Sequence, residues 1–272
     1  MGPLITSKVH AALQAAARSG TATVECSLDL DRSVVGVEVD AAGWTWQGQR
    51  FPCLATCKER TIYHWTGDGF QAISRFTRSL VKLVPTEWGP PTFEIDGIKM
   101  LPTAQVSPYA DAARKVGLIQ PQGKVVLDTC GGLGYFAAWC VEGRAARVLS
   151  YEKDPDVLWL RSLNPWSPEP GRGLNVIEGD IAEQIATLPG ASVDAVLHDP
   201  PRFGIAGELY SQAFYDQFAR VLRPRGVLFH YTGTPNKLTT GRDVPHEVAK
   251  RLRLAGFSTA LEGDGVLARK GR

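Results

Sequence analysis

The feature that most constrains the fold is a regular alternation of short apolar runs and helical stretches, which begins near residue 107. Strands separated by helices of this length require right-handed crossovers, and these produce a parallel sheet with both faces covered. Two last runs flank the turn-like Glu262-Gly263-Asp264-Gly265 and predict a closing hairpin. The pattern therefore predicts an α/β fold with seven strands, at residues 124–128, 148–152, 175–178, 195–198, 226–230, 258–261 and 265–268.

Helices are expected before the first of these strands and after each of the first five. Ser107 followed by Pro108 fits a helix cap and a first helical position, so a helix should begin there and continue to about residue 116. The remaining helical patterns cover residues 134–142, 155–163, 181–188, 208–222 and 243–255.

The first hundred residues have a different character. An alanine-rich helical stretch at 7–18 precedes several runs of strand composition, and Trp88-Gly89-Pro90-Pro91 then interrupts the chain. The expected strands lie at residues 23–28, 34–39, 44–46, 61–65, 69–74 and 80–84. We therefore predict a small, mostly β accessory domain over residues 1–100 and an α/β domain over residues 101–272.

Composition and charge narrow the functional classes. The chain shows neither a run of ~20 apolar residues nor a signal-peptide pattern, so we expect a cytoplasmic protein that does not enter membranes. Its five cysteines are irregularly spaced, which argues against a zinc site and favours reduced, buried thiols. A net charge of +2 with scattered Lys and Arg disfavours nucleic acid as a partner. A small-molecule substrate is expected, and a homo-oligomer is compatible with the sequence.

The first strand of the predicted sheet runs into a glycine-rich turn and then into a helix. It ends at Asp128, and the turn contains Gly132 and Gly134. Glycines let the backbone approach a ligand closely, and the helix that follows offers unpaired N–H groups. Taken alone, this pattern is also compatible with an ordinary tight turn between a strand and a helix.

Further carboxylates follow at the ends of the next three strands. Glu152 ends the second strand 18 residues after Gly134, where nucleotide-binding sheets place the acid that accepts ribose hydroxyls. Asp180 follows the third strand and is placed to accept a hydrogen bond from an adenine amino group. Asp199 follows the fourth. Because an acid follows each of four successive strands at one sheet edge, a binding site explains the pattern better than a set of ordinary tight turns does.

The order of these motifs resembles the class I S-adenosylmethionine (SAM)-dependent methyltransferase superfamily, over about residues 105–270. The resemblance implies a Rossmann-like, seven-stranded sheet and SAM as substrate or methyl donor, with no metal. Cys130 departs from it, because a glycine is common there. The resemblance assigns SAM binding to Asp128, Gly132, Gly134, Glu152, Asp180, Ile181 and Asp199.

Four shorter stretches resemble a narrower group, the predicted archaeal-type methyltransferases and the bacterial azetidine-2-carboxylate synthases. The synthases fold SAM so that its own amine displaces the thioether, which leaves azetidine-2-carboxylic acid and methylthioadenosine. The stretches are His198–Gly204, Gly207–Ser211, Phe229–Gly233 and Gly241–Val244.

Asp199-Pro200-Pro201 resembles the motif with which amino methyltransferases hold a nucleophilic nitrogen. Asp199 would orient an amine or take its proton, or it would only cap the proline-rich turn. Arg202 occupies the usual aromatic position and Phe203 comes one residue later, which argues against a flat acceptor stacked in the motif.

Aromatic residues and histidines crowd the same edge. The rings would stabilise a sulfonium cation or belong to the core. They are Tyr135, Phe136, Phe203 and Tyr231, of which Tyr135, Phe203 and Tyr231 join Asp199 as predicted catalytic residues. His198 and His230 could accept a proton near neutral pH, but we favour a structural role for both.

Three functions remain in competition. The leading hypothesis is a SAM cyclase that forms azetidine-2-carboxylic acid. The alternative is a methyltransferase that acts on an amine of a small molecule or of RNA. A non-catalytic SAM-binding protein is disfavoured, because binding alone does not need an amine-positioning motif. In the first two cases we expect residues 1–100 to cover the methionine end of SAM.

Overall fold

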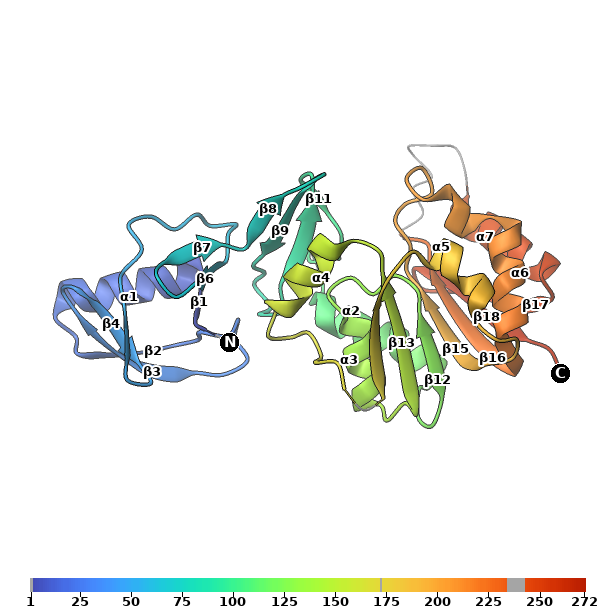
Figure 1. The fold of residues 1–272 in the computed structure, drawn as a ribbon, viewed down its shortest axis with the longest axis horizontal. Helices are drawn as coiled ribbons and strands as arrows, with labels where there is room; N and C mark the ends of the chain where they lie inside the picture. The colour runs from blue at the N-terminus through green and yellow to red at the C-terminus, as the bar shows by residue number, and fades with distance from the viewer. Residues whose placement is uncertain (1, 172, 234–242) are drawn as a thin grey trace. The chain divides into compact units, whose positions relative to one another are not determined.

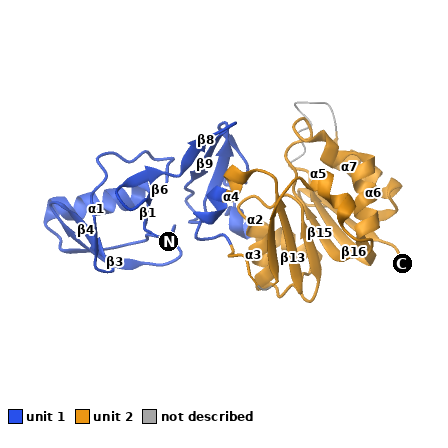
Figure 2. Ribbon diagram, in the orientation of Figure 1, with its two compact units in different colours: residues 1–110, 159–167 blue, residues 111–158, 168–272 orange. Residues whose placement is uncertain are grey.

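The computed structural model describes residues 2–171, 173–233 and 243–272. The chain forms two compact units (Figure 2). The first comprises residues 1–110 and 159–167, and the second comprises residues 111–158 and 168–272. Of the motif Gly241–Val244, residues 241 and 242 lie outside the described residues.

The second unit is built on a sheet of seven strands in the order β14-β13-β12-β15-β16-β18-β17. The first five in this order run parallel, whereas β18 is antiparallel to both β16 and β17. The predicted seven-stranded α/β fold is therefore confirmed (Figure 1). The strands are β12 Val125–Asp128, β13 Arg147–Glu152, β14 Leu174–Glu178, β15 Val193–His198, β16 Leu222–Tyr231, β17 Phe257–Glu262 and β18 Gly265–Lys270.

The helices agree with the sequence pattern in most places, and two of the expected helices are split. The stretch 208–222 divides because Ser211 caps a new helix, its Oγ accepting from the Phe214 N–H at 3.1 Å. The stretch 181–188 changes from an α-helix to a 3-10 turn. The helices are α2 Pro108–Ile119, α3 Tyr135–Glu142, α4 Pro155–Ser162, α5 Ile181–Gln184, η1 Ile185–Thr187, η2 Gly207–Tyr210, α6 Gln212–Val221 and α7 Val244–Leu254.

The core of the second unit lies between the sheet and its helices. Leu228, Val266 and Ala268 on the sheet pack with apolar residues of α5, α6 and α7. Helix α3 contacts β12 and β13 near the other end of the sheet (Figure 1). Ser107 caps α2 as expected, since its Oγ accepts from the Tyr109 N–H at 3.3 Å.

The first unit is mostly β, as predicted, with one long helix. Three small sheets are present, and Trp44, Phe51 and Phe70 pack beside the helix in one apolar cluster. The expected strand at 69–74 is two strands, β7 and β8, and four short strands were not predicted. The elements are β1 Leu4–Ile5, α1 Ser7–Ser19, β2 Thr23–Cys26, β3 Val35–Asp40, β4 Gly43–Trp46, β5 Gln49–Phe51, β6 Tyr63–Trp65, β7 Phe70–Ala72, β8 Ser74–Phe76, β9 Leu80–Val84, β10 Thr92–Ile95 and β11 Ile98–Lys99.

All five cysteines are free thiols, but the expectation that they are buried is wrong for Cys53, which is exposed. Within the described residues, no group of three His, Cys, Asp or Glu side chains is arranged to hold a metal ion. None of the helices in the described ranges is long and apolar enough to span a bilayer.

Candidate functional site

The predicted site residues gather at the carboxyl end of the parallel strands in the second unit. The chain order of the strands reverses at β12, which has β13 on one side and β15 on the other. In open α/β sheets a ligand binds at such a switch point, outside the carboxyl ends of the strands. Asp128 ends β12, Glu152 ends β13 and Asp199 directly follows β15. The topology therefore places these three acids at the carboxyl ends of three neighbouring strands.

Cys130 in the glycine-rich turn lies among these acids. Burial raises the pKa of its thiol well above the ordinary value, and the negative charges of Glu152, Asp199 and Asp128 raise it further. All three carboxylates therefore act on one point of the turn. This environment favours the protonated form of the Cys130 thiol over the thiolate.

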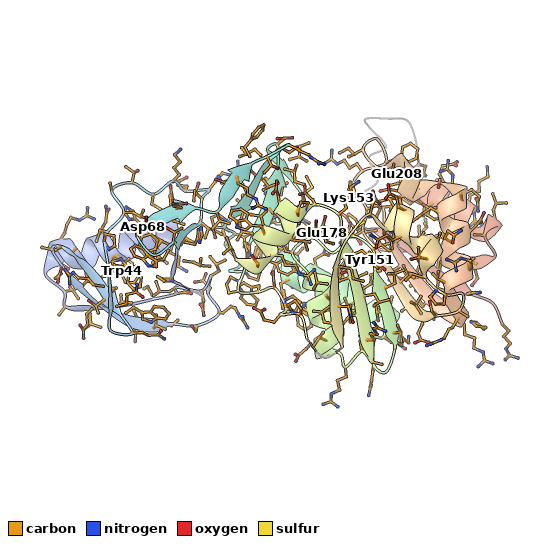
Figure 3. The ribbon with its side chains drawn as sticks, in the orientation of Figure 1. Trp44, Asp68, Tyr151, Lys153, Glu178 and Glu208 are labelled. Atoms are coloured by element: carbon orange, nitrogen blue, oxygen red, sulfur yellow. The ribbon has the colours of Figure 1, made fainter. Side chains whose placement is uncertain are left out.

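The glycine-rich turn is bonded directly to the acid of the second strand. Gly132 and Gly134 have φ values of 50° and 81°, the left-handed region that favours glycine. The Gly132 N–H donates to Glu152 Oε2 at 2.8 Å, and the Asp154 N–H donates to Oε1 at 3.0 Å. Burial raises the pKa of Glu152, although the backbone donors oppose this. Figure 3 labels Tyr151 and Lys153, the neighbours of Glu152 in the chain.

Asp128 and Asp180 each have a partner inside the fold. Asp128 is fully buried and its Oδ2 accepts from the Ser150 hydroxyl at 2.8 Å. Asp180 caps α5, with Oδ1 accepting from the Ala182 N–H at 2.8 Å, and its Oδ2 lies 3.6 Å from Lys153 Nζ. Ile181 is buried at the start of α5. The part of these residues in SAM binding stays a prediction.

Asp199 faces a buried ammonium that the sequence analysis did not identify. Lys115 projects from α2 with a side chain that is only 2% exposed, and its Nζ lies 4.0 Å from Asp199 Oδ2. The same Nζ lies 2.7 Å from Asp111 Oδ2 and 3.9 Å from Asp264 Oδ2. Burial raises the pKa of Asp199 to about 6, and the charge of Lys115 limits the rise.

The ammonium of Lys115 also lies on an aromatic face. Its Nζ is 3.6 Å from the centroid of the Tyr231 ring and 5.9 Å from that of Phe136. Tyr231 ends β16 and Phe136 belongs to α3, so side chains from α2, α3 and β16 meet at the Lys115 ammonium. The face of Tyr231 therefore holds the positive charge of Lys115, and the catalytic role of Tyr231 remains a prediction.

The other two predicted aromatic residues have different surroundings. Tyr135 is buried at the first position of α3. The ring of Phe203 packs edge-on against Tyr210, with centroids 5.5 Å apart, and Arg202 is exposed. The catalytic roles of Tyr135 and Phe203 remain predictions.

The two histidines have structural roles, as the sequence favoured. His198 Nδ1 pairs with the Thr129 hydroxyl at 2.7 Å, and its Nε2 pairs with the Leu209 carbonyl at 3.1 Å. His230 pairs with the Tyr231 carbonyl and with the Tyr215 hydroxyl. Burial lowers the pKa of His230 to about 3 and that of His198 well below its ordinary value. Both rings are therefore neutral at physiological pH.

The sequence contained one signal for Asp111 and Lys115, which the sequence analysis did not identify as site residues. Asp111 and Lys115 are four positions apart, a spacing that pairs opposite charges on one helix face. Such pairs normally lie on the surface, whereas this one is buried beside Ala112, Val116 and Ile119. Asp264 carried no comparable signal, because the sequence showed it only as part of a turn.

A cavity of about 580 Å³ lies within the first unit and contains none of the predicted site residues. Its lining carries charges of both signs, including Lys8, Arg60, Asp31 and Glu87. The candidate site lies instead in the second unit, where ionisable groups converge, because chemistry requires reactive side chains as well as space.

Comparison with known proteins shows where the chain belongs. A search against protein-family models finds no match. The uncharacterized protein MJ1233 of Methanocaldococcus jannaschii is 45% identical over 196 residues, which cover 70% of this chain and 67% of that protein. The chain belongs to the same family as MJ1233. The name of MJ1233 states no activity.

A second relative of this MJ1233-family chain carries a functional name. A "probable S-adenosylmethionine-dependent methyltransferase" of Mycolicibacterium smegmatis is 33% identical over 149 residues, 53% of this chain. The chain spans about half the length of that protein, 52%.

The fold of the MJ1233-family chain also occurs in solved structures. The spermidine synthase of Thermotoga maritima superposes with a TM-score of 0.58 at 15% identity, over 89% of this chain and 77% of that one. A spermidine synthase in complex with a transition state analogue, AdoDATO, gives 0.59 at 14% identity, over 88% and 77%. These likenesses show the fold alone. With the strand order, they show an α/β fold with a mostly parallel seven-stranded sheet, consistent with the class I SAM-dependent methyltransferase fold. The narrower resemblance to azetidine-2-carboxylate synthases receives no support and remains a prediction.

Proposed function

We propose that this chain is a SAM-dependent methyltransferase whose acceptor is an amine nitrogen of a small molecule, held by Asp199. The observation that carries the proposal is the placement of Asp199. It directly follows β15 beside the switch point, 4.0 Å from a buried ammonium and with a pKa of about 6. A carboxylate with this pKa is ionised at neutral pH and still takes up a proton readily. It can orient an amine and receive the proton that the nitrogen releases.

The residues at the crevice fit an adenosyl group. Glu152 Oε1 and Oε2 each accept one backbone hydrogen bond, and a carboxylate oxygen can accept a second from a ribose hydroxyl. Gly132 and Gly134 allow a ligand to approach the backbone closely. Asp180 Oδ2 lies 3.6 Å from Lys153 Nζ and is partly exposed, so it can accept a hydrogen bond from an adenine amino group. When bound here, SAM supplies an electrophilic carbon on a positively charged sulfur.

The charge of the pocket favours cations. Asp111, Asp199 and Asp264 contribute three negative charges, whereas Lys115 and Arg114 contribute two positive ones. Among the described residues, this network therefore carries one excess negative charge when Asp199 is ionised. A sulfonium or an ammonium would neutralise this excess, whereas a phosphate would be repelled. This balance supports a small amine over RNA.

Intramolecular cyclisation of SAM is a second candidate, favoured by the position of Phe203. Because Arg202 occupies the usual aromatic position and is exposed, and the Phe203 ring packs edge-on against Tyr210, the Asp-Pro-Pro turn is less suited to stacking a flat acceptor. An aliphatic amine suits the turn better, and the α-amine of SAM is one. In that reaction the new nitrogen–carbon bond replaces the carbon–sulfur bond, methylthioadenosine leaves, and the proton on nitrogen passes to Asp199.

One experiment separates the two reactions. Purified chain is incubated with methyl-labelled SAM, alone and with a panel of aliphatic primary amines, and the products are identified by mass spectrometry. S-adenosylhomocysteine with a labelled amine supports the methyltransferase. Methylthioadenosine and a cyclic amino acid from SAM alone support the cyclase. If calorimetry shows no binding of SAM, both proposals are wrong.

A further inference from the structure

We infer that Lys115 and Asp264 are positioning residues that control the ionisation of Asp199 in opposite senses. The inference rests on the proposed function, in which Asp199 handles the amine. Lys115 and Asp264 both lie outside the Asp-Pro-Pro motif, and their effect on the ionisation of Asp199 can be measured.

Lys115 is fixed at the centre of the charged network. Its side chain is 2% exposed, so solvent screens its charge little. Asp111, one turn earlier on α2, holds the ammonium at 2.7 Å, and the Tyr231 ring supports it at 3.6 Å. Asp199 and Asp264 both lie at the longer distances of 4.0 and 3.9 Å. They are therefore two further carboxylates that face the same charge.

Asp264 is held in place by the hairpin between β17 and β18. Arg114 donates to Asp264 Oδ1 at 2.7 Å, and the Thr232 N–H donates to the Asp264 carbonyl at 3.1 Å. A Cβ at Gly265 would lie 2.4 Å from the His230 carbonyl, so only glycine permits this close approach of the turn to β16. The preceding Gly263 has a φ of 57°. The turn thus presents Asp264 to Lys115 in a defined position.

The groups that act on Asp199 come from every element around it. Helix α2 contributes Lys115 and Asp111, and the hairpin contributes Asp264. Within the described residues, Tyr231 of β16, Tyr210 of η2 and Cys130 of the glycine-rich turn also interact with Asp199, and burial raises the pKa of each of them, so they stay neutral. His198, the residue before Asp199, is kept neutral by burial, which lowers its pKa. An opposite charge favours the ionised form of a carboxylate, and a like charge disfavours it. Lys115 therefore favours ionised Asp199, while Asp264 opposes it.

The test compares the pH profile of kcat/KM in two variants. Lys115→Met should move the acid limb to higher pH by about one unit or more, because a charge at this distance has an effect of that order. Asp264→Asn should move the limb to lower pH. Glu262→Gln is the matched control, since it removes an exposed charge from the same hairpin and should leave the limb unchanged. A merely structural role would reduce the rate without moving the limb.

A second readout keeps the inference separate from the proposed function. The carboxyl ¹³C resonance of Asp199, assigned by its loss in Asp199→Asn, titrates without any turnover. If no acceptor or cyclisation is found, this titration should still show the two opposite shifts. Titrations that coincide with wild type, or that move in one direction in both variants, would overturn the inference. If Lys115→Met does not fold, the shift in Asp264→Asn decides alone.

Discussion

Replacing Asp199 by asparagine is expected to remove activity and to make the folded protein more stable at neutral pH. Burial, followed by the charges of Lys115, Asp111 and Asp264, leaves the pKa of Asp199 at about 6, whereas an unfolded aspartate titrates near ~3.9. The folded state therefore binds the proton more tightly. As a result, the free energy of unfolding falls as the pH rises from about 4 to about 6.

The magnitude follows from this difference in pKa. Above the titration window, an ionised and fully buried Asp199 would cost about 3 kcal/mol of folding free energy. The side chain is 22% exposed, so solvent screening reduces the cost to about 1–2 kcal/mol. Asparagine keeps the shape and never ionises, and Lys115 retains Asp111 and Asp264. The variant should gain this amount at about pH 7.5 and only about a third of it at about pH 4.5.

The assay is urea unfolding followed by far-UV circular dichroism at the two pH values, together with turnover and SAM binding. Asp216→Asn, on the exposed face of α6, is the control for loss of one carboxylate. Turnover of Asp199→Asn should fall far more than SAM affinity, because asparagine cannot take a proton. The reasoning is refuted if the variant is less stable than wild type at neutral pH, or if its advantage grows as the pH falls.

Three further substitutions test other parts of the site. Glu152→Ala should weaken SAM binding in calorimetry by tenfold or more, about 1.4 kcal/mol, while Glu178→Ala, its exposed partner in the β13–β14 register, should bind like wild type (Figure 3). Gly265→Ala should destabilise the protein in urea by about 1–3 kcal/mol, since the added Cβ meets the His230 carbonyl at 2.4 Å; an unchanged midpoint would mean the hairpin can move. Tyr215→Phe should cost about 1–3 kcal/mol by leaving His230 Nε2 without its donor, with no shift of the pH profile, and such a shift would contradict the neutral state of the histidine.

The alternation of apolar runs and helical stretches in the sequence was sufficient to predict the sheet and most of the acidic residues at its strand ends. Apolar runs alternating with helices required a parallel sheet, and the carboxyl ends of parallel strands share one edge. For that reason the amino-acid sequence alone could place Asp128, Glu152 and Asp199 at the carboxyl ends of strands that the strand order shows to be neighbours. The split of residues 208–222 into η2 and α6 was missed, since a serine cap inside a helical pattern is a weak signal.

The charged centre was decided by tertiary structure alone. Lys115, Asp199 and Asp264 are far apart in the chain and meet only because α2, β15 and the last hairpin converge. From the sequence alone, a lysine on a helix is expected at the surface. Its burial is tolerated only when carboxylates from other elements surround it. Likewise, the sequence showed an aromatic residue at 203, but only packing turned that ring toward Tyr210. The sequence determined which acids follow the parallel strands, and the fold determined which distant charges meet around the buried Lys115 beside the strand ends.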